Sequence, residues 1–306
     1  MSGTSFQIGP SNGGLCWTLE TRSAILNSTR TTTVTGAMAE QILVHTGFHK
    51  TGTTSAQNLL RANRLLLRPH VSVHLRRHLT ELRRRAMRYS LNGQARALGR
   101  FGEAAHRYFE EVAADPDRPD RICISAEDLS GHPPGWHDSI LDYGAAPDLA
   151  GKLAEALRAS FPRADIAFVL TTRAITPWLD SLYWHLVITT PIRMSRDEFH
   201  ARYRRGGRLD RIAEEIGKAV KPALAAALPM ETLIKERFGT AEALIGPMDL
   251  PTAVLDRLET VPPARSRLKT DLLDKMLAAN RSIEDEEALA DHKRRLMGKP
   301  PAAGAA

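Results

Sequence analysis

The sequence predicts an α/β fold, in which helices flank a parallel sheet and a largely helical part follows at the C-terminal end. Short apolar runs of strand length occur at residues 42–45, 121–126 and 165–171. Segments with helical periodicity separate these runs, and such alternation is typical of parallel sheets joined by crossover helices. With 306 residues, 42% hydrophobic and 25% charged, the chain is long enough for one large domain of this kind.

The N-terminal half of this fold begins with the run at residues 42–45, which is long enough for a buried strand and too short for a helix. A leucine stripe then predicts a helix over residues 54–67, closed by Pro69. Arginine-rich helices are expected at residues 75–90 and 95–114.

The remaining two strands are expected to have a helix between them, at residues 150–160. After the third strand a helix is expected to run from Pro177 to about residue 189. Thr176 can act as its N-cap, and proline fits the first helical position. Beyond Ser195 the pattern is mostly helical and places no strand.

One domain is expected to span residues 38–297. Residues 1–37 are rich in Ser, Thr and Gly and show no sustained period, so we expect them to be disordered or the result of a misassigned start site. Residues 298–306 are expected to form a flexible tail.

The charge balance favours anionic ligands, since the net charge is +7 and the pI about 9.6. Twelve arginines lie between Arg61 and Arg107, against only Glu81 and Glu103. Solvated outer faces of two helices are the simpler interpretation, and a basic rim that binds a polyanion is the other. Few aromatic residues are interleaved with these arginines, which disfavours nucleic acid as the partner.

The cysteine and hydropathy patterns predict a cytoplasmic protein. Cys16 and Cys123 lie in different contexts and suggest no disulfide framework. No apolar stretch approaches the roughly 18–20 residues that a membrane span needs, and the N-terminus lacks the features of a secretory signal. His132 and His137 have no further ligands clustered with them, so no metal site is predicted.

The stretch ILVHTGFHKTGTT (residues 42–54) combines a strand end, a loop with Gly47 and Gly52, and a helix start. Glycines allow a tight turn in which successive N–H groups point into one concavity. The helix start adds unpaired N–H groups and the positive end of its dipole. With Lys50 beside it, this loop predicts an anion site in a P-loop-like sheet, although a purely structural turn is the alternative.

The position of the lysine narrows the choice of anion. In the ATP-binding loop G-x-x-x-x-G-K-[ST], lysine follows the last glycine and the next hydroxyl holds Mg²⁺. Thr53 occupies that lysine position here, and Lys50 precedes Gly52. The pattern therefore favours a donor with a shorter 5′ tail and no required metal.

A second group of polar residues follows the third strand. Arg173 leaves the strand end, and Ser181 lies in the second turn of the next helix. Carboxyl ends of parallel strands share one edge, so both residues are expected on the same side as the Gly47 loop. A guanidinium and a hydroxyl suit a second phosphate, whereas a surface arginine at a helix start is the alternative.

Together the two groups describe a ligand with two separate phosphate positions, such as 3′-phosphoadenosine 5′-phosphosulfate (PAPS). On these residues the sequence resembles the PAPS-dependent sulfotransferase family, as a bacterial or carbohydrate-type member, over about residues 42–190. The stretch GFHKTGTTS is similar to that family's 5′-phosphosulfate loop. The resemblance implies a sulfotransferase-like domain that binds PAPS without a metal through Gly47, His49, Lys50, Thr51, Gly52, Thr53, Thr54, Arg173 and Ser181.

The resemblance also implies transfer of a sulfuryl group to an acceptor hydroxyl or amine. Lys50 is expected at the leaving oxygen. Glu127, just past the second strand, is the first candidate for the base that takes the acceptor proton, followed by His49 and then His132. A structural loop carboxylate is the alternative for Glu127. Ser125 is expected to line the pocket.

Several questions stay open at this level. The chain lacks the C-terminal R-K-G-x-x-G loop of cytosolic family members, and Arg265, Arg267 and Lys269 are candidates to replace it, or simply surface residues. A P-loop nucleotide kinase or NTPase with Asp128 as its metal ligand is an alternative function. A non-catalytic protein that binds nucleotide or polyanion is another. The acceptor (sugar, lipid or small molecule) and the oligomeric state are not predicted.

Overall fold

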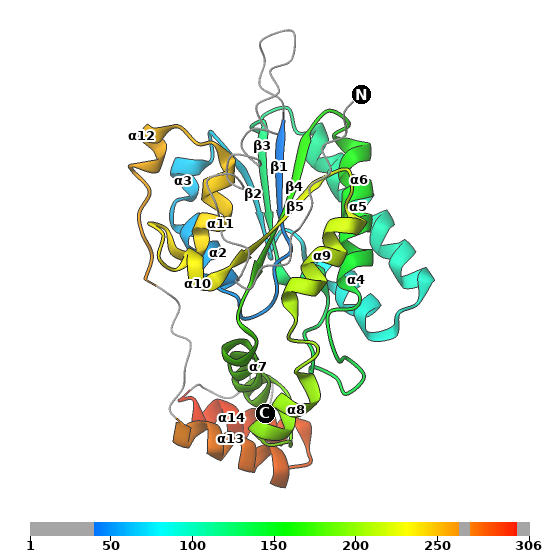
Figure 1. The fold of residues 1–306 in the computed structure, drawn as a ribbon, viewed down its shortest axis with the longest axis vertical. Helices are drawn as coiled ribbons and strands as arrows, with labels where there is room; N and C mark the ends of the chain where they lie inside the picture. The colour runs from blue at the N-terminus through cyan, green and yellow to red at the C-terminus, as the bar shows by residue number, and fades with distance from the viewer. Residues whose placement is uncertain (1–39, 263–269, 299–306) are drawn as a thin grey trace, which may run out of the picture.

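A computed structural model describes residues 40–262 and 270–298 (Figure 1). The expectations for residues 1–37 and 299–306, and the suggested role of Arg265, Arg267 and Lys269, lie outside the described residues.

The core of the fold is a parallel sheet of five strands in the order β2-β3-β1-β4-β5, which confirms the predicted α/β class. The strands are β1 (Gln41–His45), β2 (Ser72–Leu75), β3 (Arg121–Ser125), β4 (Asp165–Thr172) and β5 (Leu224–Pro229). In the register of the sheet, Gln41 of β1 lies opposite Arg121 on one side and Asp165 on the other. The central strand β1 is therefore paired on both sides, and its carboxyl end lies in the middle of the sheet edge.

Helices cover both faces of the sheet (Figure 1). One face packs against α2 (Thr53–Ala62), near α3 (Arg64–Leu67), α10 (Met230–Leu233), α11 (Glu242–Ile245) and α12 (Thr252–Leu255). The other packs against α6 (Ala146–Ser160) and α9 (Leu209–Ala219), with α4 (Thr80–Asn92) and α5 (Ala95–Ala114) beyond them. Three short 3-10 helices are η1 (Glu127–Ser130), η2 (Gly239–Ala241) and η3 (Gly246–Met248).

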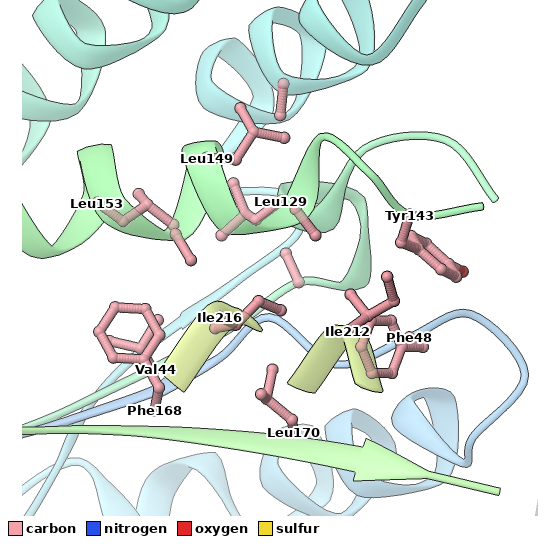
Figure 2. Close-up of a cluster of buried hydrophobic side chains, with 14 of the residues drawn as sticks. Val44, Phe48, Leu129, Tyr143, Leu149, Leu153, Phe168, Leu170, Ile212 and Ile216 are labelled. Atoms are coloured by element: carbon pink, nitrogen blue, oxygen red, sulfur yellow. The ribbon is translucent and has the colours of Figure 1, made fainter. Parts of the chain in front are cut away.

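Alternation along each strand supplies the two cores. Ile42 and Val44 of β1 point to the side of α6 and α9, whereas Leu43 between them points to the side of α2. Figure 2 shows Val44 among side chains of β4, α6 and α9. Because both faces are buried, the strands read as continuous apolar runs, and this is why three of the five could be predicted.

Two strands, β2 and β5, were not predicted from the sequence. β2 is a sheet edge of four residues, SVHL, and carries polar Ser72 and His74. β5 reads LAAALP, and its alanines favour helix, but pairing with β4 overrides that preference. Both are edge strands, which bury less side-chain area and leave a weaker apolar signal.

Several predicted helix boundaries also differ from the observed ones. The expected helix at 54–67 is divided at Asn63 into α2 and α3, and the one at 75–90 begins only at Thr80, after β2. The helix after β4 is α7 (Ile175–Thr189), and its N-cap is Ala174. Thr176 and Pro177 therefore lie within its first turn, so the predicted cap was wrong.

A group of four helices lies beyond the carboxyl ends of the strands: α7, α8 (Arg196–Tyr203), α13 (Thr270–Ser282) and α14 (Glu286–Leu296) (Figure 1). Buried polar groups of α13 and α14 meet the C-terminal end of α7. The Asn280 amide donates to the carbonyl of Ile192, and the Lys293 ammonium donates to that of Thr190 at 2.8 Å. This anchors the helix that carries Ser181. Within the part of the chain that the structure describes, no helix has the length and apolarity needed to cross a membrane.

Candidate functional site

A cavity of about 560 Å³ lies at the carboxyl edge of the sheet, and residues that follow each of the five strands line it. The residues that follow the strands and line it are Lys50 after β1, Arg76 after β2, Glu127 after β3, Arg173 after β4 and Met230 after β5. Further walls come from the start of α2 and from α4 and α7. Four cationic side chains and two carboxylates line the cavity, so its charge is predominantly positive.

The loop between β1 and α2 turns sharply at two residues. Lys50 has φ 69° and Gly52 has φ 95°, and both values lie in the left-handed region. A Cβ on Gly52 would lie 2.4 Å from Cγ2 of Thr240, so only glycine fits. The Thr51 hydroxyl lies inside the turn, where it donates to the Phe48 carbonyl at 2.6 Å and contacts the Thr171 hydroxyl.

The start of α2 offers unused hydrogen-bond donors to the cavity. Its N-cap is Gly52, and no side chain caps it. The hydroxyl of Thr53 is buried and has no hydrogen-bond partner within residues 40–262 and 270–298, and Thr53 lines the cavity. An uncapped helix start with an unpaired hydroxyl is the local arrangement that binds an anion.

Lys50 is the cation closest in sequence to this helix start. Its ammonium has no hydrogen bond or ion pair within the described part of the chain, and it lines the cavity. Burial, and after it the charge of Arg173, lower the pKa of Lys50, while the Glu127 carboxylate opposes them.

Arg173 and Ser181 lie on the same cavity as this loop, as expected from the sheet edge. Arg173 Nη1 donates to the carbonyl oxygen of Lys50 at 3.1 Å. Ser181 is partly exposed on α7. The Lys50 loop and the Arg173–Ser181 pair, which lie on separate segments of the sequence, therefore line the same cavity.

Asp128 lines the same cavity and is the centre of an ionic cluster. Its Oδ2 accepts from Arg83 Nε at 2.5 Å and from Arg76 Nη2 at 2.8 Å, and its Oδ1 accepts from His49 Nε2 at 3.1 Å. Burial alone raises the pKa of Asp128, but the hydrogen bond from His49 and the charges of His49, Arg76 and Arg83 outweigh it and lower that pKa below its usual range. Asp128 is therefore a buried carboxylate whose acceptor positions are taken.

His49 uses both ring nitrogens inside the same network. Nε2 carries the proton donated to Asp128, and Nδ1 lies 3.0 Å from the Tyr143 hydroxyl. That hydroxyl also accepts from the His49 backbone N–H, and Trp178 Nε1 donates to the His49 carbonyl. The rings of Tyr143 and Trp178 are buried, and burial raises the pKa of Tyr143 well above its ordinary value. The imidazole is thus held in one orientation.

The carboxylate of Glu127 also accepts hydrogen bonds on both oxygens. One carboxylate oxygen accepts from Arg76 Nη1 at 3.0 Å and the other from Gln57 Nε2 at 3.2 Å. The side chain is only 7% exposed, and it lines the cavity on the side of Lys50 and Arg76.

Of the residues expected to bind the donor or act in catalysis, most line this cavity: His49, Lys50, Gly52, Thr53, Thr54, Glu127, Arg173 and Ser181. Among the described residues, Gly47 and Thr51 lie outside the cavity lining. Gly47 is packed against His45 and Thr171, which leaves no room for a side chain. Both shape the turn beneath the cavity.

Three further residues, Ser125, His45 and His132, lie below or beside the cavity and do not line it. Ser125 is fully buried and pairs with His45 Nδ1 at 2.9 Å, so it does not line the pocket. His45 is structural, since its Nε2 contacts the Thr171 hydroxyl. His132 stacks on Trp136 and lies outside the lining.

Several residues that complete the walls were not singled out from the sequence, among them Arg76, Arg83, Met87, Trp136, His185 and Met230. One signal was available, because His185 lies four residues after Ser181 and hence on the same helix face. Arg76 and Arg83 were not distinguishable from the other arginines around them.

Comparison with protein-family models, curated proteins and solved structures found no match to this chain. Within the described ranges, no group of three or more His, Cys, Asp or Glu residues is arranged to hold a metal ion.

Proposed function

We propose that this chain is a PAPS-dependent sulfotransferase whose β1–α2 loop is a P-loop-like phosphate-binding loop. One observation carries the proposal. The Lys50 loop with the start of α2, and the Arg173–Ser181 pair, are two separate anion-binding groups that line a single cavity and are joined by the hydrogen bond from Arg173 to Lys50.

The hydrogen-bond donors that line the cavity fit the two ends of PAPS. The unpaired Thr53 hydroxyl, the uncapped start of α2 and the Lys50 ammonium are all donors, which suit the 5′-phosphosulfate. Arg173 and Ser181 suit the 3′-phosphate. A cavity of about 560 Å³ also lies within the usual size of small-molecule sites, roughly 300–1,000 Å³.

The chemistry of the proposed reaction is sulfuryl transfer to an acceptor hydroxyl or amine. Lys50 would stabilise the negative charge that develops on the 5′-phosphate as it leaves. Thr53 and the α2 amides would hold the sulfuryl oxygens in line with the acceptor. A base must take the acceptor proton, and two of the sequence-based candidates, Glu127 and His49, line the cavity.

The alternative of a Mg²⁺-dependent nucleotide kinase or NTPase relies on Asp128 as a metal ligand. In this structure Asp128 already accepts hydrogen bonds from two arginines and His49, so a cation would have to displace them. Because these side chains already compensate the charge of Asp128, the carboxylate is a poor candidate for a Mg²⁺ ligand, and this favours the sulfotransferase proposal.

Isothermal titration tests the proposal. The protein should bind 3′-phosphoadenosine 5′-phosphate (PAP) more tightly than ATP with Mg²⁺, and it should transfer label from sulfur-labelled PAPS to at least one acceptor in a panel of sugars, lipids and phenols. Preferential binding of ATP with Mg²⁺ would overturn the proposal. Tight PAP binding with no transfer to any acceptor would instead favour the non-catalytic nucleotide-binding alternative.

A further inference from the structure

Sulfuryl transfer from PAPS to a neutral hydroxyl needs a group with a free lone pair at the cavity. Glu127 and His49 line the cavity, but their acceptor atoms are engaged. Glu127 accepts from Arg76 and Gln57, and His49 lies between Asp128 and Tyr143. A proton on Glu127 would weaken its ion pair with Arg76, and His49 could accept a proton on Nδ1 only after releasing the Tyr143 hydroxyl.

His185 also lines the cavity and is not engaged in this way. It is on α7, one helical turn after Ser181, so both side chains belong to the same face of the helix. Its ring is partly exposed to the cavity and makes no hydrogen bond to the residues that the structure describes. The anchored C-terminal end of α7 keeps this face in place.

We propose that His185 is the catalytic base of the sulfuryl transfer, an inference that rests on the function proposed above. The acceptor oxygen forms a bond to sulfur while the bond from sulfur to the 5′-phosphate oxygen breaks. The acceptor proton passes to a ring nitrogen of His185, and the electrons of the broken bond leave with the 5′-phosphate. Lys50 stabilises the negative charge that this phosphate gains. The proton is then released to solvent as the product leaves.

Burial, together with the charges around His185, keeps the ring neutral before the donor binds. Burial, and after it the charges of Lys50, His49 and Arg76, lower the pKa of His185 to about 4, while Asp128 opposes them. The other charged groups that line the cavity are Arg83, Glu127 and Arg173. A bound polyanionic donor offsets these cations, which raises the pKa of His185 and makes it a stronger base.

The test compares two acceptors of similar shape and different acidity, phenol and p-nitrophenol. p-Nitrophenol ionises at mildly alkaline pH and then needs no base, whereas phenol stays protonated. We expect His185→Asn to lower kcat for phenol by about 100-fold or more, and kcat for ionised p-nitrophenol by less than about 10-fold. PAP binding should match the wild type, which shows that the variant is folded.

The control is His106→Asn, which changes a histidine of α5 outside the cavity lining and should leave both rates unchanged. An independent readout is the wild-type pH profile for phenol, whose acid limb should disappear in His185→Asn. Hydrolysis of labelled PAPS, with water as the acceptor, provides a third rate.

The possible failures are distinguishable. Equal losses for both phenols with PAP binding intact, or no loss for phenol, would overturn the role of His185 and leave the proposed function standing. PAP binding by the wild type without transfer to water or to any acceptor of the panel above would overturn the role as well, because no sulfuryl transfer would then exist for His185 to assist. A wild-type protein that does not bind PAP would remove the proposed function itself.

Discussion

Nη1 of Arg173 donates a hydrogen bond to the backbone carbonyl of Lys50 across 3.1 Å, although the two residues are 123 positions apart. Lys50 has a left-handed backbone conformation, and the bond ties this turn to the end of β4. The same guanidinium lines the cavity. This contact therefore links the two proposed phosphate sites directly.

Replacing Arg173 with Ala should weaken PAPS binding by about 1.5–3 kcal/mol, as expected for a charge-assisted contact. Adenosine 5′-phosphosulfate, which lacks the 3′-phosphate, should lose much less affinity. Ser181→Ala should act in the same direction by about 0.5–1.5 kcal/mol. Titration calorimetry with both ligands checks this. Equal losses for the two ligands would mean that Arg173 acts only by supporting the loop.

Replacing Lys50 with Met should reduce kcat by about 100-fold or more, with a smaller effect on the Kd of PAP. The reason is that the ammonium should interact most strongly with the charge that develops on the leaving oxygen. Lys235→Met, at an exposed position outside the cavity, is the control. A rise in KM alone, with kcat unchanged, would identify Lys50 as a ground-state anchor.

Gly52 should tolerate no side chain. Gly52→Ala combines a positive φ with a Cβ placed 2.4 Å from Thr240, whereas Gly93→Ala has positive φ and open space around it. We expect Gly93→Ala to cost about 1 kcal/mol of unfolding free energy, and Gly52→Ala to cost more and to lose PAP binding. Thr240→Ser removes the Cγ2 methyl, and in the double variant it should restore part of both. No rescue would indicate that the contact with Thr240 is not the cause.

The part of the site that could be predicted consists of residues that directly follow a recognisable strand in the sequence. Lys50, Gly52 and Thr53 follow a buried strand, and Arg173 follows another, so the rule that parallel strands share a carboxyl edge brings them together. No knowledge of strand order was needed for that step.

The ionic cluster of Asp128 with its arginine and histidine partners could not be predicted in the same way. Arg76 reaches Asp128 only because β2 pairs with β3, and β2 has too few apolar residues to be recognised. Arg83 resembles its neighbours Arg84 and Arg85 until the orientation of α4 is known. Pairing between a carboxylate and one of twelve arginines is a property of the tertiary structure.

Asp128 should contribute to stability in a pH-dependent manner. Its side chain is 3% exposed, and its removal leaves Arg76, Arg83 and His49 without their shared counter-charge. Fully buried pairs cost roughly 3–5 kcal/mol when broken. Because Arg76 is 42% exposed, we expect about 2–4 kcal/mol for Asp128→Asn at neutral pH. Asp210→Asn, in an exposed pair, should cost less than about 1 kcal/mol.

The pH dependence follows from the pKa of Asp128, which is lower in the folded protein than in the unfolded chain. The unfolded chain binds the extra proton, so this stabilisation is complete above about pH 4 and is lost as the pH falls toward the folded-state pKa. Urea denaturation over an acid pH series should show a steeper loss for the wild type than for Asp128→Asn. Parallel curves would contradict the assignment.

Lys293 should make stability rise with pH over a different range. It is 5% exposed, and burial lowers its pKa to about 8 while its ammonium donates to the Thr190 carbonyl. The unfolded chain keeps an ordinary lysine pKa near 10.4, so it binds more protons than the folded protein between about pH 8 and pH 10. The charged form is therefore a stability cost that disappears as the pH rises through this range.

Replacing Lys293 with Met keeps the apolar stem and removes the titration. The difference in unfolding free energy between the wild type and Lys293→Met should thus change in favour of the wild type from about pH 8 to pH 10. Lys152→Met, in an exposed pair with Glu155, should show no such change. Denaturant titrations at several pH values measure it. Because Lys293 contacts the end of α7 that follows Ser181 and His185, PAP binding at neutral pH provides a second readout. A loss of binding in Lys293→Met without a loss of stability would show that the α14 anchor positions this helix face for the ligand.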